Sequence, residues 1–96
     1  MPSKHHKLLV PREVADVIRT LHPHIKKKVK ASLQIILSDP HSGKSLKNEL
    51  VELKSFRVSK FRIIYRMGTG RIVELVAVGP RERIYEETYR LIRSGR

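Results

Sequence analysis

The chain has 96 residues, of which 21 are lysine or arginine and 9 are aspartate or glutamate, giving a net charge of +12. Hydrophobic residues make up 40% of it, enough for one modest core in a single domain over 1–96. The absence of cysteine excludes disulfides, thiol catalysis and zinc–thiolate sites, and fits a cytoplasmic protein. No apolar run approaches the roughly 20 residues of a membrane span, so no membrane partner is expected. The positive charge favours nucleic acid or an acidic protein as the partner, against a merely solvated surface.

The N-terminal part of the sequence is expected to form a strand over 4–10 and then two helices. Pro11 suits the first turn of a helix over 11–21, whose apolar residues recur at helical spacing. A second, amphipathic helix is expected over 23–38, with an apolar stripe formed by Ile25, Val29, Leu33, Ile36 and Leu37. Two consecutive helices with a tight connection predict an αα-hairpin.

The C-terminal part changes to the period of β-strands. After a turn over 39–43 and a less regular stretch, three strands are predicted at 53–58, 61–67 and 72–78. Ser59-Lys60 and Gly68-Thr69-Gly70 are the hairpin connections, and both glycines of the second can take positive φ. The third strand is apolar on both faces apart from Glu74, which indicates a covered strand.

A final helix is expected over 83–92, with Ile84, Thr88, Leu91 and Ile92 on one side. The whole is an α+β fold in the order β-α-α-β-β-β-α. It consists of a small antiparallel β-sheet with the N-terminal αα-hairpin packed on one face.

The hairpin over 54–66 concentrates positive charge: its cations are Lys54, Arg57, Lys60, Arg62 and Arg66. Alternation along the second strand directs Arg62, Ile64 and Arg66 to the face opposite Phe61, Ile63 and Tyr65. Arginines held on a strand offer a fixed bidentate fork to phosphate. A charged, solvated sheet face is the alternative, but Ile64 between two arginines favours a lined cleft.

A second group of candidate residues follows the covered strand directly, in the segment GPRERIY over 79–85. Arg81 and Tyr85 are four residues apart, so on a helical turn they share one face. Such a pair can grip a phosphate and stack a base, and Arg83 adds a further candidate for substrate binding. A helix start with an ion pair and a packed tyrosine is the alternative.

At this point the sequence resembles a known family. The runs SFRVSKFRIIYRM and GRIVELVAVGPRERIYEE, preceded by LHPHIKKKVKASLQIILSDPHSGKSLKNEL, are similar over roughly 20–90 to RelE-type toxins of the RelE/ParE superfamily. The resemblance implies the fold above and an endoribonuclease, an mRNA interferase of a type II toxin–antitoxin pair, which cuts mRNA in the ribosomal A site. It matches Arg62 to the strand arginine, Arg81 to the arginine after the last core strand, and Tyr85 to the aromatic that follows.

The sequence also departs from the pattern of the family. Pro80 stands where some relatives carry a histidine, and the strand before Arg62 offers Lys54 and Arg57, with Lys60 in the turn, where others use a lysine pair or a glutamate. The general base is therefore left open between Lys54 and Lys60. The ParE branch of the superfamily poisons DNA gyrase and lacks the ribonuclease residues.

The hypothesis for the chemistry is RNA cleavage without metal or cofactor. Arg62 and Arg81 would offset phosphate charge, with Arg57, Arg66 and Arg83 binding substrate, and Tyr85 or a water would protonate the leaving oxygen. A lysine crowded by arginines would give up its proton more readily and act as base. The histidines do not favour a metal site: the spacing of His22 and His24 is poor, and His41 in a turn is only an alternative base.

The resemblance implies three partners: mRNA, the ribosome through its small-subunit RNA, and a cognate antitoxin. An acidic antitoxin segment is expected because the surface to be covered is strongly positive. Retention of Arg62, Arg81 and Tyr85 together favours the ribonuclease. The alternatives are a gyrase-inhibiting toxin without nuclease activity and a non-toxic basic module that binds ribosomes or nucleic acid.

Overall fold

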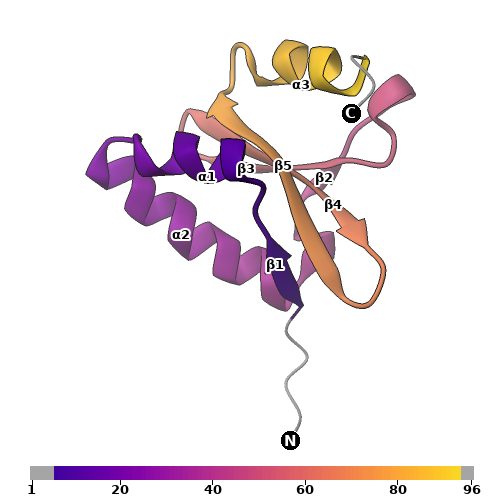
Figure 1. The fold of residues 1–96 in the computed structure, drawn as a ribbon, viewed down its shortest axis with the longest axis horizontal. Coiled ribbons are helices and arrows are strands. Elements are labelled where there is room, and N and C mark those ends of the chain that lie inside the picture. The colour runs from indigo at the N-terminus through magenta and orange to yellow at the C-terminus, as the bar shows by residue number, and fades with distance from the viewer. Residues whose placement is uncertain (1–5, 94–96) are drawn as a thin grey trace, which may run out of the picture.

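The computed structural model describes residues 6–93, apart from the side chain of Glu49, and confirms the α+β class and the predicted order of elements (Figure 1). The elements are β1 Lys7–Leu9, α1 Arg12–Arg19, α2 Pro23–Ser38, β2 Lys44–Ser45, β3 Lys54–Val58, β4 Phe61–Gly68, β5 Ile72–Pro80 and α3 Ile84–Arg93. The short strand β2 lies in the stretch expected to be less regular, between two one-turn 3-10 helices, Pro40–Ser42 and Asn48–Leu50. The predicted first strand began at residue 4, which lies outside the described residues.

The five strands form one sheet in the order β1-β5-β4-β3-β2. The strands β3 to β5 pair antiparallel, as expected, and the unpredicted β2 pairs antiparallel with β3, but β1 pairs parallel with β5, so the sheet is mixed. Parallel neighbours need a long connection, and here α1, α2 and the strands β2 to β4 all lie between β1 and β5 in the chain. The edges of the sheet are thus β1 on one side and β2 on the other.

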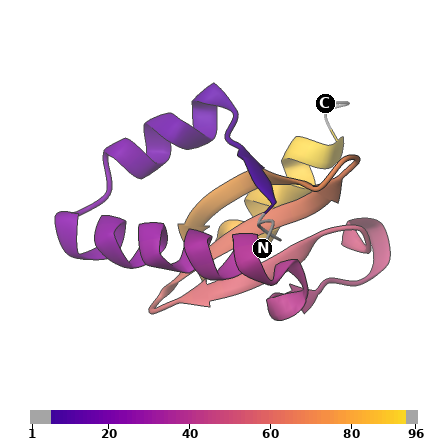
Figure 2. The ribbon, with the colours of Figure 1, turned by 90° about the horizontal axis from the view of Figure 1, so that it is seen from below.

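Each face of the sheet is covered by different helices, and each has its own core. The larger core lies under the αα-hairpin and includes Val29, Leu33, Ile36, Ile63, Tyr65, Leu75 and Val78. The smaller core lies under α3 and consists of Leu53, Ile64, Ala77 and Ile84. Figure 2 shows α2 and α3 on opposite sides of the sheet. The predicted alternation of Ile63, Ile64 and Tyr65 is confirmed, and β5 is the covered strand that its composition indicates.

A bulge interrupts the pairing of β4 with β5. Ile64 pairs with Ala77 and Tyr65 with Leu75, so Val76 is an extra residue on β5. Both Val76 and Ala77 consequently belong to the side of the smaller core, where strict alternation would have separated them.

The turn after α2 is fixed by the hydroxyl of Tyr65, which donates to the carbonyl of Pro40 at 2.7 Å and accepts from the amide of Gly43 at 3.0 Å. Burial raises the pKa of this hydroxyl above its ordinary value of 10.0. A Cβ at Gly43 would meet Cε1 of Tyr65 at 2.9 Å, so the close approach requires glycine.

The two hairpin turns differ in detail from the expectation. Ser59 has φ 57 in the first turn; in the second, Gly70 has φ 70 and Arg71 φ 62, whereas Gly68 ends β4. No helix between residues 6 and 93 is both long and apolar enough to cross a membrane.

Candidate nucleic-acid site at the turn end of the sheet

Arg62 lies near the start of β4, on the face covered by α3. It pairs directly with Arg57 on β3 and with Gly79 on β5. Two residues further on, Ile64 belongs to the core under α3, which assigns Arg62 and Arg57 to the same face. Like charges directly opposite each other on a sheet destabilise it, and an anion between them would offset this cost.

The guanidinium of Arg62 is part of a small polar network. Its Nη1 donates to Oγ of Ser55 at 3.4 Å, and the same Oγ lies 3.0 Å from the hydroxyl of Tyr85 on α3. The Nε of Arg62 is buried and has no hydrogen-bond partner among the described residues. An unpaired buried donor is costly, so a phosphate oxygen or a water molecule that accepts from it would stabilise this part of the protein.

Arg81 and Lys60 are brought together by the backbone. The amide of Arg81, directly after β5, donates to the carbonyl of Lys60 at 2.8 Å, and the amide of Arg83 donates to the carbonyl of Pro80 at 3.1 Å. Arg81 and Arg83 are exposed, and within the described part of the chain neither side chain has an ion-pair partner. We call Arg57, Lys60, Arg62, Arg81 and Arg83 the turn-end cluster.

Gly79 lets α3 approach this part of the sheet. A Cβ at Gly79 would meet Cδ1 of Ile84 at 2.9 Å and Oε1 of Glu87 at 3.6 Å. The close approach positions Tyr85 over Ser55 and brings the carboxylate of Glu87 near the turn-end cluster. Neither Ser55 nor Glu87 was predicted from the sequence as a site residue. The strand period would have found Ser55, because it shares the parity of Arg57.

Lys54 lies apart from the turn-end cluster. It precedes Ser55 on β3 and therefore points to the opposite face, where its Nζ donates to Oγ of Ser45 at 3.0 Å. The expected grouping of Lys54 with Arg62 followed from nearness in the sequence, but the alternation of the strand separates the two side chains.

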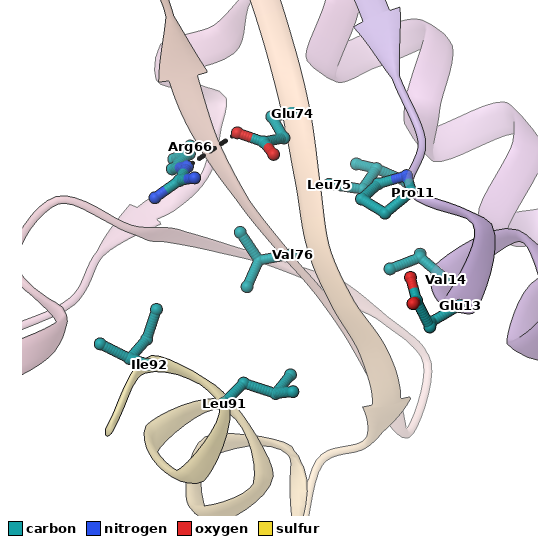
Figure 3. Close-up of a pocket in the computed structure, with 9 residues that line it drawn as sticks. All are labelled: Pro11, Glu13, Val14, Arg66, Glu74, Leu75, Val76, Leu91 and Ile92. Carbon is teal, nitrogen blue, oxygen red and sulfur yellow. Dashed lines mark hydrogen bonds and ion pairs between the residues drawn. The ribbon is translucent and has the colours of Figure 1, made fainter. Parts of the chain in front are cut away.

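Arg66 is also separate from the turn-end cluster, four residues along β4 from Arg62. Its Nε forms an ion pair with Glu74 at 2.8 Å, at the edge of a cavity of about 330 Å³ (Figure 3). Leu91 and Ile92, predicted on the apolar side of the last helix, face this cavity and remain partly exposed.

No group of three or more histidine, aspartate or glutamate side chains within residues 6–93 is arranged to hold a metal ion. His22 and His24 stack on each other at 5.7 Å between ring centroids, and the Nδ1 of His22 accepts from the amide of His24. His41 is exposed in the one-turn helix Pro40–Ser42, which is hydrogen-bonded to the hydroxyl of Tyr65. Tyr65 belongs to the core under the αα-hairpin, on the face of the sheet opposite Arg62.

The fold, with an αα-hairpin on one face of the sheet and α3 on the other, is shared with solved structures of small toxins from toxin–antitoxin pairs. The toxin–antitoxin complex RelBE2 from Mycobacterium tuberculosis matches with a TM-score of 0.73 and 22% identity, over 83% of this chain and 95% of that one. A mutant of the Escherichia coli toxin RelE in the free state matches with a TM-score of 0.70 and 18% identity, over 88% of this chain and 90% of that one. The archaeal RelE–RelB complex from Pyrococcus horikoshii matches with a TM-score of 0.65 and 13% identity, over 82% of this chain and 98% of that one. These likenesses show the shared fold.

Residues 10–85 match the family described as ParE toxin of type II toxin-antitoxin system, parDE. The chain belongs to this family. No curated protein matches the sequence.

Proposed function

We propose that this toxin is an endoribonuclease that cuts mRNA in the cytoplasm, in the ribosomal A site and without a metal ion, and thereby inhibits translation. The observation that carries the proposal is the buried Nε of Arg62, a donor without a partner among the described residues, next to the Ser55–Tyr85 pair. A phosphate oxygen would satisfy this donor and relieve the repulsion between Arg57 and Arg62.

Charge stabilisation is the part of the reaction that the turn-end cluster supports best. Arg62 is held on a strand and would contact the scissile phosphate, and Arg81, exposed at the end of β5, would close on it from the side. Preorganised cations of this kind stabilise the charge that develops in the transition state. Tyr85 would stack on a base or protonate the leaving 5′-oxygen, with Ser55 holding its hydroxyl.

The general base would be Lys60 or Glu87 more readily than Lys54. Lys60 belongs to the turn-end cluster, and Glu87 approaches the same face beside Gly79, whereas the alternation of β3 directs Lys54 to the other face. Removing the proton of the 2′-hydroxyl would give a 2′,3′-cyclic phosphate and a 5′-hydroxyl as products.

The proposed partners are mRNA, the ribosome and a cognate antitoxin. A net charge of +12 and a row of exposed arginines favour an acidic segment of the antitoxin over this surface. Several of the similar solved structures are themselves complexes of a RelE toxin with its antitoxin.

The test is cleavage of end-labelled mRNA on programmed ribosomes, with free mRNA alongside, by the wild type and by Arg81→Ala. The wild type should cut in the A site, and the variant should not. Deoxyribose at the cleaved nucleotide should abolish the cut. A folded, toxic protein that cuts neither substrate would overturn the proposal.

Inhibition of DNA gyrase is the second candidate function, and the family match favours it, since the family bears the ParE name. The lack of a lysine next to Arg62 on β3 also agrees with a protein that binds without cutting. A gyrase inhibitor would block supercoiling by purified gyrase and leave the mRNA of the same cells intact, which is the reverse of the result expected above.

A further inference from the structure

The turn between β3 and β4 carries an exposed serine within the turn-end cluster. Ser59 and Lys60 connect Val58 to Phe61, and these last two residues pair with each other across the hairpin. The strand ladder therefore fixes the position of the turn. Ser59 has φ 57, and its side chain is exposed. A serine hydroxyl is thus presented to solvent at the end of the sheet that bears the arginines.

The hydroxyl of Ser59 differs from the hydroxyls of the other serines between residues 6 and 93. It has no hydrogen-bond partner among the described residues, whereas the carbonyl of Ser59 accepts from Arg57. Each of the other serines interacts with a backbone carbonyl, a lysine or a tyrosine; these are Ser32, Ser38, Ser42, Ser45 and Ser55. Ser59 is therefore the one serine in this part of the chain whose hydroxyl is both exposed and available for modification.

Three cations of the turn-end cluster lie beside this turn. The Nε of Arg57 donates to the carbonyl of Ser59 at 3.5 Å, which holds that guanidinium group at the turn. Lys60 is the next residue, and the amide of Arg81 donates to its carbonyl at 2.8 Å. Over the residues that the structure describes, none of the three side chains has an ion-pair partner. A group attached to Oγ of Ser59 would therefore lie within reach of several uncompensated positive charges.

A phosphoryl group is the modification that fits these neighbours. Phosphoserine carries a charge of about −1.5 to −2 at pH 7 and three strong acceptor oxygens. Arginine offers a bidentate fork to such a group and forms charge-assisted hydrogen bonds with it. An acetyl group on the same oxygen would bring no charge to balance the cations.

We propose that Ser59 is a phosphorylation site that switches the turn-end cluster off. A protein kinase transfers the terminal phosphoryl group of a nucleoside triphosphate: Oγ of Ser59 bonds to the phosphorus, the bond to the bridging oxygen breaks, a nucleoside diphosphate leaves and the hydroxyl proton is released. The attached phosphate pairs with Arg57 and Arg81 and occupies the cations that an RNA phosphate would need. The switch rests on the proposed function, because it regulates the same site.

Attachment to the chain makes this phosphate an effective competitor. Tethering gives it an effective concentration on the order of millimolar beside the arginines, and its charge repels the backbone of an approaching RNA. It would also offset the repulsion between Arg57 and Arg62, which lie opposite each other. Phosphorylation should therefore lower the affinity for RNA and raise the stability of the fold together, a combination that the loss of a structural contact would not produce.

Full-length protein made with phosphoserine at position 59 tests the switch. The control carries the same group in place of Thr69, which is exposed in the turn at the other end of β4. Each protein is measured for its affinity for a short RNA with deoxyribose at the cleaved position, for mRNA cleavage on programmed ribosomes and for its urea midpoint. Phosphorus NMR follows the titration of the phosphate. Mass spectrometry of the toxin from the cells that encode it, growing and starved, shows whether Ser59 is modified there.

Phosphoserine at position 59 should weaken RNA binding and cleavage by about tenfold or more and raise the urea midpoint. The same group at position 69 should change binding less than about twofold, as expected of an exposed charge. The phosphate at position 59 should titrate below its ordinary pKa of about 6, because the guanidinium groups favour the dianion. Equal effects at the two positions, an ordinary phosphate pKa, or unmodified Ser59 in both growing and starved cells would overturn the switch.

Failure of the ribonuclease function is distinguishable from failure of the switch. If the unmodified protein does not cut mRNA, a lowered phosphate pKa and a modified Ser59 in cells still support a switch that acts on the anion site. If the unmodified protein cuts but the phosphate titrates as it does in water, the ribonuclease stands and the switch is wrong.

Discussion

The two faces of the sheet differ in how far their buried polar groups find hydrogen-bond partners. Under the αα-hairpin lies the larger core, in which the hydroxyl of the fully buried Tyr65 has both a donor and an acceptor partner. Under α3, a smaller core adjoins two arginines placed opposite each other and a buried Nε that no described residue satisfies.

The difference indicates which face mainly stabilises the fold and which face carries the candidate site. A buried donor without a partner and a like-charge pair both lower the stability of the folded state, so their coincidence at Arg62 favours a ligand there. Substitutions of core residues on the hairpin face should therefore change the free energy of unfolding, and substitutions in the turn-end cluster on the α3 face should change activity.

The largest effect is expected from Arg62→Ala. Removing a preorganised cation should lower kcat/KM for mRNA cleavage by about 10²–10³-fold. The free energy of unfolding should stay level or rise by about 0.2–1 kcal/mol, because Arg57 no longer faces a like charge. Cleavage kinetics and urea unfolding of the same preparation measure both.

Arg66→Ala is the matched control on the same strand. Its ion pair with Glu74 is partly exposed, so its loss should cost at most about 1 kcal/mol and leave cleavage unchanged. Equal losses of activity in Arg62→Ala and Arg66→Ala would mean that the whole strand binds RNA, and the distinction between its two ends would fail.

A smaller effect is expected from Gly79→Ala, which acts on the site through α3. The added Cβ would meet Cδ1 of buried Ile84 at 2.9 Å, so the start of α3 must shift, and Tyr85 with it. We expect a loss of stability of about 1 kcal/mol and a fall in cleavage between about tenfold and 100-fold. Gly68→Ala meets nothing closer than 3.5 Å and should leave both quantities unchanged. If Gly79→Ala retains full activity, the position of Tyr85 does not control the reaction.

Much of the fold was predictable because each element carries its own period. The apolar stripe and Pro23 predict the second helix over 23–38, and the structure has it at Pro23–Ser38, because these features fix both its register and its start. The parallel pairing of β1 was not predictable, because three residues at an edge carry no signal of direction. The bulge at Val76 was hidden for a different reason: a strand that is apolar on both faces shows no break in alternation.

The residues of the candidate site were predictable where the position of a residue within its own strand or helix decides which way its side chain points. Arg62 and Tyr85 were singled out separately, and the structure joins them through Ser55. That contact spans 30 residues and depends on how closely α3 can approach at Gly79, which no local pattern contains. Lys54 illustrates the opposite case, since strand parity was available in the sequence and already separates it from Arg62.

On the hairpin face, Tyr65→Phe should cost stability without costing activity. It leaves the carbonyl of Pro40 and the amide of Gly43 without their partner, which should lower the free energy of unfolding by about 1–3 kcal/mol. Tyr89→Phe, which removes an exposed hydroxyl that accepts from Arg93, should cost less than about 0.5 kcal/mol. Urea unfolding and mRNA cleavage of the two variants separate the effects, and a loss of cleavage in folded Tyr65→Phe would contradict the division between the faces.

The smallest effect concerns alkaline pH and the same hydroxyl. Burial raises the pKa of Tyr65 above 10.0 in the folded state, whereas in the unfolded chain it stays near that value. Below the unfolded pKa both states are protonated, so this group gives no pH dependence. Above it the unfolded chain loses the proton first, and stability falls until the pH passes the folded pKa. The wild type should therefore lose stability relative to Tyr65→Phe as the pH rises above the ordinary tyrosine pKa of 10.0. A constant difference between the two across that range would mean that the buried hydroxyl titrates as it does in water.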